Sequence, residues 1–194
     1  GLELEGIHIA TNKNDILDRL ISTGIYTKNQ TIKSLAPSMD ISVASNFERL
    51  MVEVLNNDRS KLNELMHIFP ENSLNFNHYP EWKKISSFFS SSKTSDQEIK
   101  KCIEEVVSNS NYFIDPHTAT AVEGLLGSKV PGENILTFAT AHPAKFPDAF
   151  HGINGFNDII PPELISIFEK EESLIKLKNN YEEISNFISS NYIN

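Results

Sequence analysis

Three polar side chains follow an apolar run near residue 140. The apolar run over residues 135–139 predicts a β-strand, and Thr140, His142 and Lys145 follow it in a loop that contains Pro143. In open α/β sheets, ligands bind beyond the carboxyl ends of the strands. A hydroxyl, an imidazole and an ammonium group within six residues of a strand end therefore make a candidate binding site.

Each of these side chains also has an ordinary structural explanation. The Thr140 hydroxyl can bond a ring nitrogen of a ligand, or it can satisfy a backbone group of its own turn. His142 can titrate or stack on a ring, and Lys145 can bind a phosphate as a point charge, but exposed loop residues of both types are common. No carboxylate or second histidine lies at helical spacing from His142, so no metal site is expected there.

A second polar group lies where a helix is expected to begin. Asp115 is typical of an N-cap, and Pro116 is typical of the first helical position. His117 and Thr118 follow in the first turn, where unpaired N–H groups and the helix dipole attract anions. A plain N-cap explains Asp115 and Pro116 but not His117.

Thr11 and Asn12 occupy another loop that follows an expected strand. Residues 7–10 predict this strand, a helix follows from Asp15 to Thr23, and Gly24 suits the position after its end. A strand, a short polar loop and a helix form half of a βαβ unit. Thr11 and Asn12 could therefore contact the same ligand as the loop after residue 139.

The remaining pattern predicts an α/β fold in which helices outnumber strands. A further strand is expected over residues 112–114, and the serine-rich residues 86–95 indicate a mobile insertion or hinge. This alternation favours a partial parallel sheet flanked by helices. Three or four strands are too few for a complete doubly wound sheet, which indicates part of a larger domain. Further helices are expected over 45–55 with a Ser45–Glu48 capping box, 59–68, 95–107 with a Ser95–Glu98 capping box, 115–126, 162–172 and 180–190.

Composition limits the class of protein. The 194 residues carry a net charge of −9, which argues against nucleic-acid or anionic-membrane binding. The single cysteine, Cys102, excludes an internal disulfide and predicts a buried apolar residue in a reducing, cytoplasmic setting. No apolar stretch approaches the roughly 18 residues of a membrane span. The chain opens without a starter methionine, so we expect a fragment of a larger protein.

Four segments, in this order along the chain, resemble the threonine synthase family. Each motif alone is moderately specific, but four in the same order are specific for the family, and the resemblance covers residues 7–146. The segments are IATNKND (9–15), PSMDI (37–41) with SNFER (45–49), DPHTA (115–119) and TAHPAKF (140–146). The chain is similar only to the C-terminal part of these enzymes.

The resemblance implies a fold-type II pyridoxal-phosphate (PLP) enzyme, a lyase in which the cofactor lies between two α/β domains. These enzymes convert O-phospho-L-homoserine and water to L-threonine and phosphate in threonine biosynthesis. Thr140 matches the Ser or Thr that hydrogen-bonds the pyridine nitrogen of the cofactor in this fold group. His142, Thr11 and Asn12 would also contact the cofactor, and the cleft lining would include Asp115, His117, Thr118 and Lys145. Residues 1–146 would belong to the large PLP-binding domain, with a helical insertion at about 50–110, and 147–194 would form a C-terminal helical tail.

The residues missing from the resemblance matter as much as those present. The lysine that holds the cofactor covalently and the loop that binds its phosphate precede Gly1 in the family's order, so no residue here is assigned as catalytic. We expect the chain alone to be inactive and to need the N-terminal part of the same enzyme. Two alternatives stay open: a threonine synthase-like phospho-lyase that yields 2-oxobutyrate, and a non-catalytic binding module.

Overall fold

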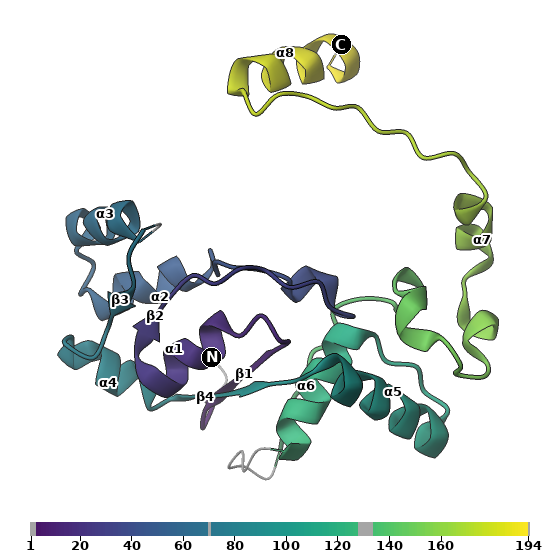
Figure 1. Ribbon diagram of the computed structural model, residues 1–194, viewed down its shortest axis with the longest axis horizontal. Helices are drawn as coiled ribbons and strands as arrows, with labels where there is room; N and C mark the ends of the chain where they lie inside the picture. The colour runs from purple at the N-terminus through teal and green to yellow at the C-terminus, as the bar shows by residue number, and fades with distance from the viewer. Residues whose placement is uncertain (1–2, 70, 128–133, 194) are drawn as a thin grey trace. The chain divides into compact units, whose positions relative to one another are not determined.

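The computed structural model describes residues 3–69, 71–127 and 134–193, and the chain divides into two compact units at residues 159 and 160 (Figure 1). The first unit is an α/β fold rich in helix, as predicted. It contains β1 (Ile7–Thr11), α1 (Ile16–Thr23), β2 (Ile25–Tyr26), η1 (Pro37–Met39), α2 (Phe47–Val54), α3 (Arg59–Ile68), β3 (Leu74–Asn75), α4 (Pro80–Ser86), β4 (Phe89–Lys93), α5 (Asp96–Ser110), α6 (Pro116–Gly127), η2 (Pro143–Lys145), η3 (Pro147–Phe150) and η4 (Phe156–Ile159). The second unit contains α7 (Pro162–Phe168) and α8 (Tyr181–Tyr192).

A two-stranded parallel sheet lies at the centre of the first unit. β1 and β4 pair with Ile7 opposite Phe89 and Thr11 opposite Lys93. Parallel strands are normally covered on both faces, and α1 and α6 both pack on these two strands. Successive side chains of a strand point to opposite faces, so the sheet separates the side chains that meet α1 from those that meet α6.

The serine-rich segment predicted to be mobile forms strand β4 instead. Its serines fit a partly buried sheet because their hydroxyls have partners: Ser90 and Ser92 bond the two ring nitrogens of His8 at 2.8 and 2.9 Å, and Ser91 donates to Asp18 at 2.7 Å. Burial lowers the pKa of His8, and the nearby Asp18 offsets part of that effect. Side chain pairing across the sheet thus compensates for the low strand propensity of serine.

Two predicted strands are wrong. Residues 134–140 adopt irregular backbone, and Ile135, Leu136 and Phe138 are exposed. A strand needs a neighbour for its backbone hydrogen bonds, and no described strand pairs with this run. Residues 112–114 are also irregular, although Phe113 and Ile114 are buried.

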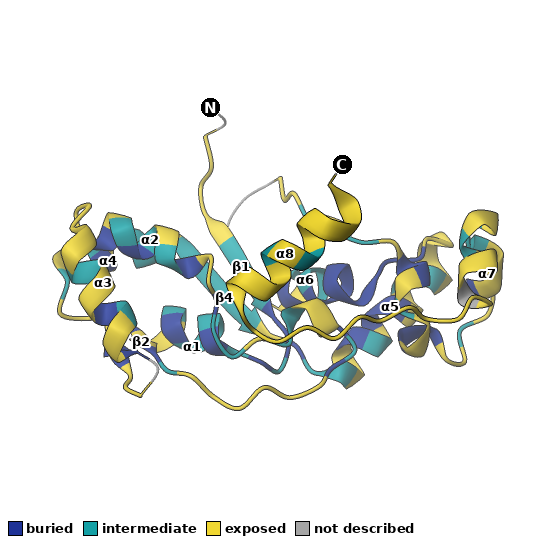
Figure 2. Cartoon of the chain, turned by 90° about the horizontal axis from the view of Figure 1, so that it is seen from above, coloured by how far each residue is buried: buried dark blue, intermediate teal, exposed yellow. Residues whose placement is uncertain are grey.

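A hydrophobic core rich in aromatic residues lies among α1–α4 and the short β2–β3 pair of the first unit. Tyr26 stacks on Phe69 with ring centroids 4.6 Å apart, and Phe47 meets Phe76 edge-on at 5.5 Å. Figure 2 shows the buried residues of these elements in dark blue. Residues 147–159 also belong to the first unit, where Phe150 and Phe156 stack at 4.3 Å.

Helix termini follow the sequence in most places. Gly24 ends α1 with a φ of +72°, and the Ser95–Glu98 capping box opens α5 as predicted. The box at Ser45 is wrong, because α2 begins at Phe47 without a side chain cap. The first N–H groups of α2 bond carbonyls of the preceding turn instead, as Phe47 does to Ala44 at 3.0 Å.

In the second unit, α8 begins after Asn180, whose side chain accepts a hydrogen bond from the Glu183 N–H at 3.0 Å. Ile184 and Ile188 of this helix are exposed. Among all described residues, no helix is both long and apolar enough to cross a membrane.

Candidate cofactor-binding site

Asn12 lies fully buried in the loop after β1 and ties that loop to residues 34–40. Its side chain N–H groups lie 2.7 Å from Ser34 Oγ, 3.2 Å from the Ala36 carbonyl and 2.8 Å from Asp40 Oδ1. Its carbonyl oxygen accepts the Asn14 backbone N–H at 2.8 Å. Both ends of the Asn12 amide are therefore occupied by the protein, so this side chain shapes the loop.

Thr11 is used in a similar way. The Thr11 hydroxyl donates to the Ser92 carbonyl at 3.0 Å, close to the end of the β1–β4 pair. Like Asn12, Thr11 is buried. Thr11 and Asn12, two of the four residues predicted to contact the cofactor, thus use their side chains for hydrogen bonds within the protein.

His117 is a buried residue at the meeting point of three segments. Its Nδ1 lies 2.8 Å from Asp115 Oδ1, and its Nε2 lies 3.0 Å from the backbone nitrogen of Ser38. The edge of the ring faces Phe146, with centroids 4.7 Å apart. Because the Ser38 N–H can only donate, Nε2 must accept, and Nδ1 carries the proton.

Asp115 organises the start of α6 around this histidine. Its carboxylate accepts the His117 backbone N–H at 2.9 Å, the His117 Nδ1–H and the Thr118 hydroxyl. Burial by itself raises the pKa of Asp115, but the hydrogen bonds from His117 and Thr118 outweigh it and hold the pKa below its ordinary value. Asp115, His117 and Thr118 therefore form one charged, hydrogen-bonded group.

The loop after residue 139 presents its polar side chains to solvent. Thr140 is exposed, and its hydroxyl has no hydrogen-bond partner among the described residues. His142 is exposed and its Nδ1 accepts the Ala144 N–H at 3.2 Å, which caps η2. Lys145 is exposed within η2 and has no ion pair in the described part of the chain. Thr140 and Lys145 are thus free to meet a ligand.

Two buried residues, Asn12 and His117, connect the four predicted segments. Asn12 joins the β1 loop to Asp40, and His117 joins the start of α6 to Ser38 on one side and Phe146 on the other. Reasoning from single residues missed Ser34, Ser38 and Asp40 as site neighbours. For Ser38 and Asp40 the signal was the PSMDI motif, which was noted for family resemblance but assigned no contacts, whereas Ser34 lies outside that motif.

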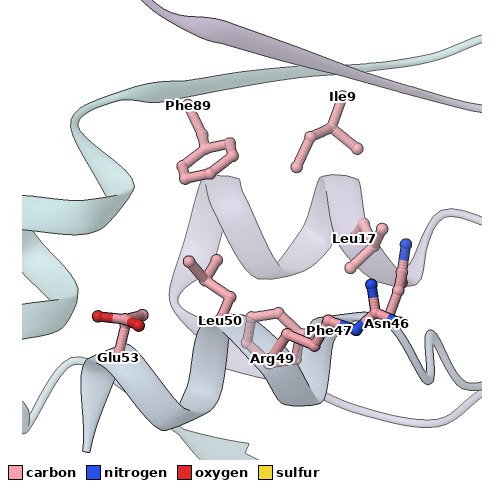
Figure 3. A pocket seen from close by; sticks show the side chains of 8 residues that line it. All are labelled: Ile9, Leu17, Asn46, Phe47, Arg49, Leu50, Glu53 and Phe89. Atoms are coloured by element: carbon pink, nitrogen blue, oxygen red, sulfur yellow. The ribbon is translucent and has the colours of Figure 1, made fainter. Parts of the chain in front are cut away.

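One cavity of the first unit lies away from these residues. Figure 3 shows this cavity of about 360 Å³ beside α1 and α2, and none of the predicted site residues lines it. Its walls are mainly apolar, so it offers few hydrogen bonds to a polar cofactor. The lining residues are Ile9, Leu17, Asn46, Phe47, Arg49, Leu50, Glu53 and Phe89.

The fold and the polar loops around it define part of a fold-type II PLP enzyme. The structure matches PLP-bound threonine synthase from Brucella melitensis with a TM-score of 0.82 and 34% identity, over 98% of this chain and 41% of that one. Threonine synthase from yeast matches with a TM-score of 0.75 and 29% identity, over 97% and 42%.

Sequence comparison leads to the same family. The family model described as "Threonine synthase, C-terminal" matches residues 118–188. Threonine synthase of Pseudomonas aeruginosa is 35% identical over 97% of this chain, and that of Saccharomyces cerevisiae is 35% identical over 91%. The chain belongs to the threonine synthase family. It spans 41% and 40% of the length of these two relatives.

Proposed function

We propose that the chain forms the C-terminal part of a threonine synthase and contributes one wall of its PLP cleft. The complete enzyme would convert O-phospho-L-homoserine and water to L-threonine and phosphate in the cytoplasm. The observation that carries this proposal is the convergence on His117, where the PSMDI, DPHTA and TAHPAKF motifs meet. Motifs that are distant in sequence but share one buried hub are consistent with a common site.

The exposed polar residues of the loop after residue 139 have the chemistry to contact PLP and its substrate. Bound PLP supplies an electron sink for carbanions formed on the substrate. The exposed, unpartnered Thr140 hydroxyl can bond the pyridine nitrogen of PLP without forcing that nitrogen to be protonated, as a carboxylate would. The Lys145 ammonium offers a point charge for a substrate phosphate, and His142 would lie along the same loop.

The buried predicted residues would act by positioning. Thr11 and Asn12 would hold the loop after β1, while Asp115 and Thr118 would hold the start of α6, through the hydrogen bonds already described. None of the chain's lysines is assigned to bind the cofactor covalently. We propose that the N-terminal part of the same enzyme supplies that lysine, so the chain alone would be inactive.

Replacing Thr140 tests the proposal in the full-length enzyme. Thr140→Val keeps the shape of the side chain but removes its hydroxyl, so turnover to L-threonine should fall about tenfold, equivalent to about 1.4 kcal/mol in the barrier. Thr140→Ser should retain most of the rate. Thr137→Val, in the same irregular segment, is the matched control and should leave turnover unchanged.

Product analysis in the same assay distinguishes the reactions. Formation of L-threonine supports the proposal, whereas formation of 2-oxobutyrate as the main product would contradict it. An unchanged turnover number in Thr140→Val would remove Thr140 from the cofactor site.

A further inference from the structure

A long irregular segment crosses the first unit between β2 and α2. We call residues 27–46 the strap; apart from the three-residue η1, it contains no helix or strand. In Figure 1 it leaves β2, passes α1 and approaches the start of α6 before it returns to α2. Such a segment depends on side chains from its neighbours to fix its backbone.

Those side chains come from three places, namely the loop after β1, the start of α5 and strand β2. Asn14 bonds both backbone groups of Ile32, at 2.7 and 2.8 Å. Asp96, at the start of α5, accepts the Leu35 N–H at 3.1 Å. The Tyr26 hydroxyl accepts the Ala44 N–H at 2.8 Å. With the Asn12 contacts to residues 34–40, these bonds fix both arms of the strap.

The tip of the strap, at η1, depends on His117. The Ser38 N–H is one of the first N–H groups of η1, which have no partner within the helix. His117 Nε2 accepts that N–H at 3.0 Å. No other described side chain bonds the backbone of residues 37–39.

The chemical state of His117 is what makes this contact possible. An imidazolium donates from both nitrogens, so only the neutral ring can accept from Ser38. The Asp115 carboxylate holds the proton on Nδ1 and so leaves the Nε2 lone pair free for Ser38. A carboxylate–imidazole–amide chain thereby fixes the tip of the strap to the start of α6.

The residue fixed in this way has a free hydroxyl. Ser38 is exposed, and its Oγ has no partner among the described residues. The other contact of the His117 ring is Phe146, in the loop that carries Thr140 and Lys145. The His117 ring therefore contacts two segments that each carry a free polar group: the Ser38 hydroxyl in one, and the Lys145 ammonium in the other.

We propose that His117 is a positioning residue that holds Ser38 in place, so that the Ser38 hydroxyl forms part of the substrate site. The ligand would be an oxygen-rich anion, such as the phosphate or carboxylate of an amino-acid phosphate, because a hydroxyl can donate to either. The role of Ser38 rests on the proposed function, whereas the hold of His117 on the strap does not.

Two substitutions separate the two bonds of His117. His117→Gln can place a carbonyl oxygen near the position of Nε2 and keep an acceptor for Ser38. His117→Asn can keep a donor near the position of Nδ1 for Asp115 but cannot reach Ser38. We expect hydrogen exchange of the Ser38 amide in the full-length protein to quicken roughly five- to tenfold in His117→Asn, as for one lost hydrogen bond, and to stay near the wild-type rate in His117→Gln.

The exchange experiment decides the first part of the proposal. Residues 32–35 serve as an internal control, because Asn14 and Asp96 hold them independently of His117. Equal exchange in the two variants, or no change in either, would overturn the hold of His117 on the strap. This readout stands even if the enzyme does not form threonine.

Kinetics of the full-length enzyme decide the second part. Ser38→Ala should raise KM for O-phospho-L-homoserine about tenfold and change kcat less, as expected for loss of a substrate hydrogen bond. His117→Asn should also raise KM. The double variant of Ser38→Ala and His117→Asn should have a KM no higher than that of the more impaired single variant, because both substitutions act through the Ser38 hydroxyl. Ser45→Ala, another exposed strap serine, is the matched control.

The outcomes are distinguishable from failure of the proposed function. An unchanged KM in Ser38→Ala, in an enzyme that does form L-threonine, would remove Ser38 from the substrate site. An enzyme that forms no L-threonine would overturn the proposed function and the substrate role of Ser38, and the exchange result would still decide the role of His117.

Discussion

Asp115 is a buried carboxylate that hydrogen bonds keep charged. The carboxylate has the His117 and Thr118 hydrogen bonds in the folded protein, and these hold its pKa below the ordinary value against the opposite effect of burial. A carboxyl group with a lowered native pKa stabilises the fold at pH values above its unfolded pKa of about 3.9, and this contribution is lost as pH falls through the native pKa. The charged form of Asp115 therefore stabilises the folded protein at neutral pH.

Asp115→Asn should therefore lower the free energy of unfolding in a pH-dependent way. At pH 7 we expect a loss of about 1–3 kcal/mol, the usual range for a buried hydrogen bond to a charged group. Urea denaturation at pH 7, 5 and 3 should show the difference from wild type shrinking at pH 3, because this pH lies below the unfolded pKa of about 3.9 and folding must then remove a proton from the carboxyl group. Asp148→Asn, at an exposed carboxylate, is the control. A difference that stays constant down to pH 3 would contradict this account.

The sequence indicated which side chains are polar and reactive, but it did not indicate which of them are buried and bonded within the protein. Thr11 and Asn12 look like ligand contacts because they are polar and follow a strand, yet their partners lie at residues 34–40 and 92. Such partners are distant in sequence, and local spacing carries no information about them. His117 differs, since an N-cap did not explain it and the structure gives it two specific bonds.

At the scale of elements, the start of α5 is a helix terminus with a complete capping box. Ser95 Oγ accepts the Glu98 N–H at 3.3 Å, and the Glu98 carboxylate accepts the Ser95 N–H at 2.7 Å. Hydrogen bonds from the Ser95 side chain and backbone also lower the pKa of Glu98. This reciprocal pair satisfies two N–H groups that a helix leaves unpaired.

Ser95→Ala should destabilise the protein by about 1 kcal/mol, which is typical for loss of an N-cap. The matched control is Ser45→Ala, because Ser45 has the same capping-box spacing to Glu48 but makes no side chain cap. Thermal unfolding of both variants should show a lower midpoint for Ser95→Ala alone. Equal shifts in the two variants would mean that sequence spacing, and not the observed hydrogen bonds, determines the cap.

Helices were predicted far better than strands, for a physical reason. The hydrogen bonds and capping groups of a helix are close in sequence, so α1, α3 and α5 follow from local pattern and composition. Strands depend on distant partners. β4 is a strand because His8 and Asp18 satisfy its serines, while residues 135–139 have strand composition but no described neighbour.

At the scale of the whole molecule, the sheet and the lysines beside it bear on which part of a PLP site the chain would hold. Its parallel sheet has two strands, and it has an apolar run at residues 135–138 that stays exposed. Two of its lysines near the end of the sheet are already paired, Lys13 with Asp96 at 2.7 Å and Lys93 with Asp15 at 3.1 Å. Neither of these two lysines is therefore free for the cofactor, which agrees with the proposed role of the chain as one wall of the cleft.

The chain alone should therefore fail to bind PLP covalently at a single site. Mixed with PLP, it should show no discrete absorbance at about 410–430 nm, and after a later reduction with borohydride it should show no stoichiometric adduct at one lysine by peptide mass spectrometry. The full-length enzyme treated in parallel should show the absorbance before reduction and the adduct after it, with the modified lysine outside residues 1–194. Scattered, substoichiometric labelling of exposed lysines is the expected background for the chain alone. A single, fully labelled lysine within residues 1–194 would contradict the assignment, because the covalent side of the cofactor site would then lie in this chain.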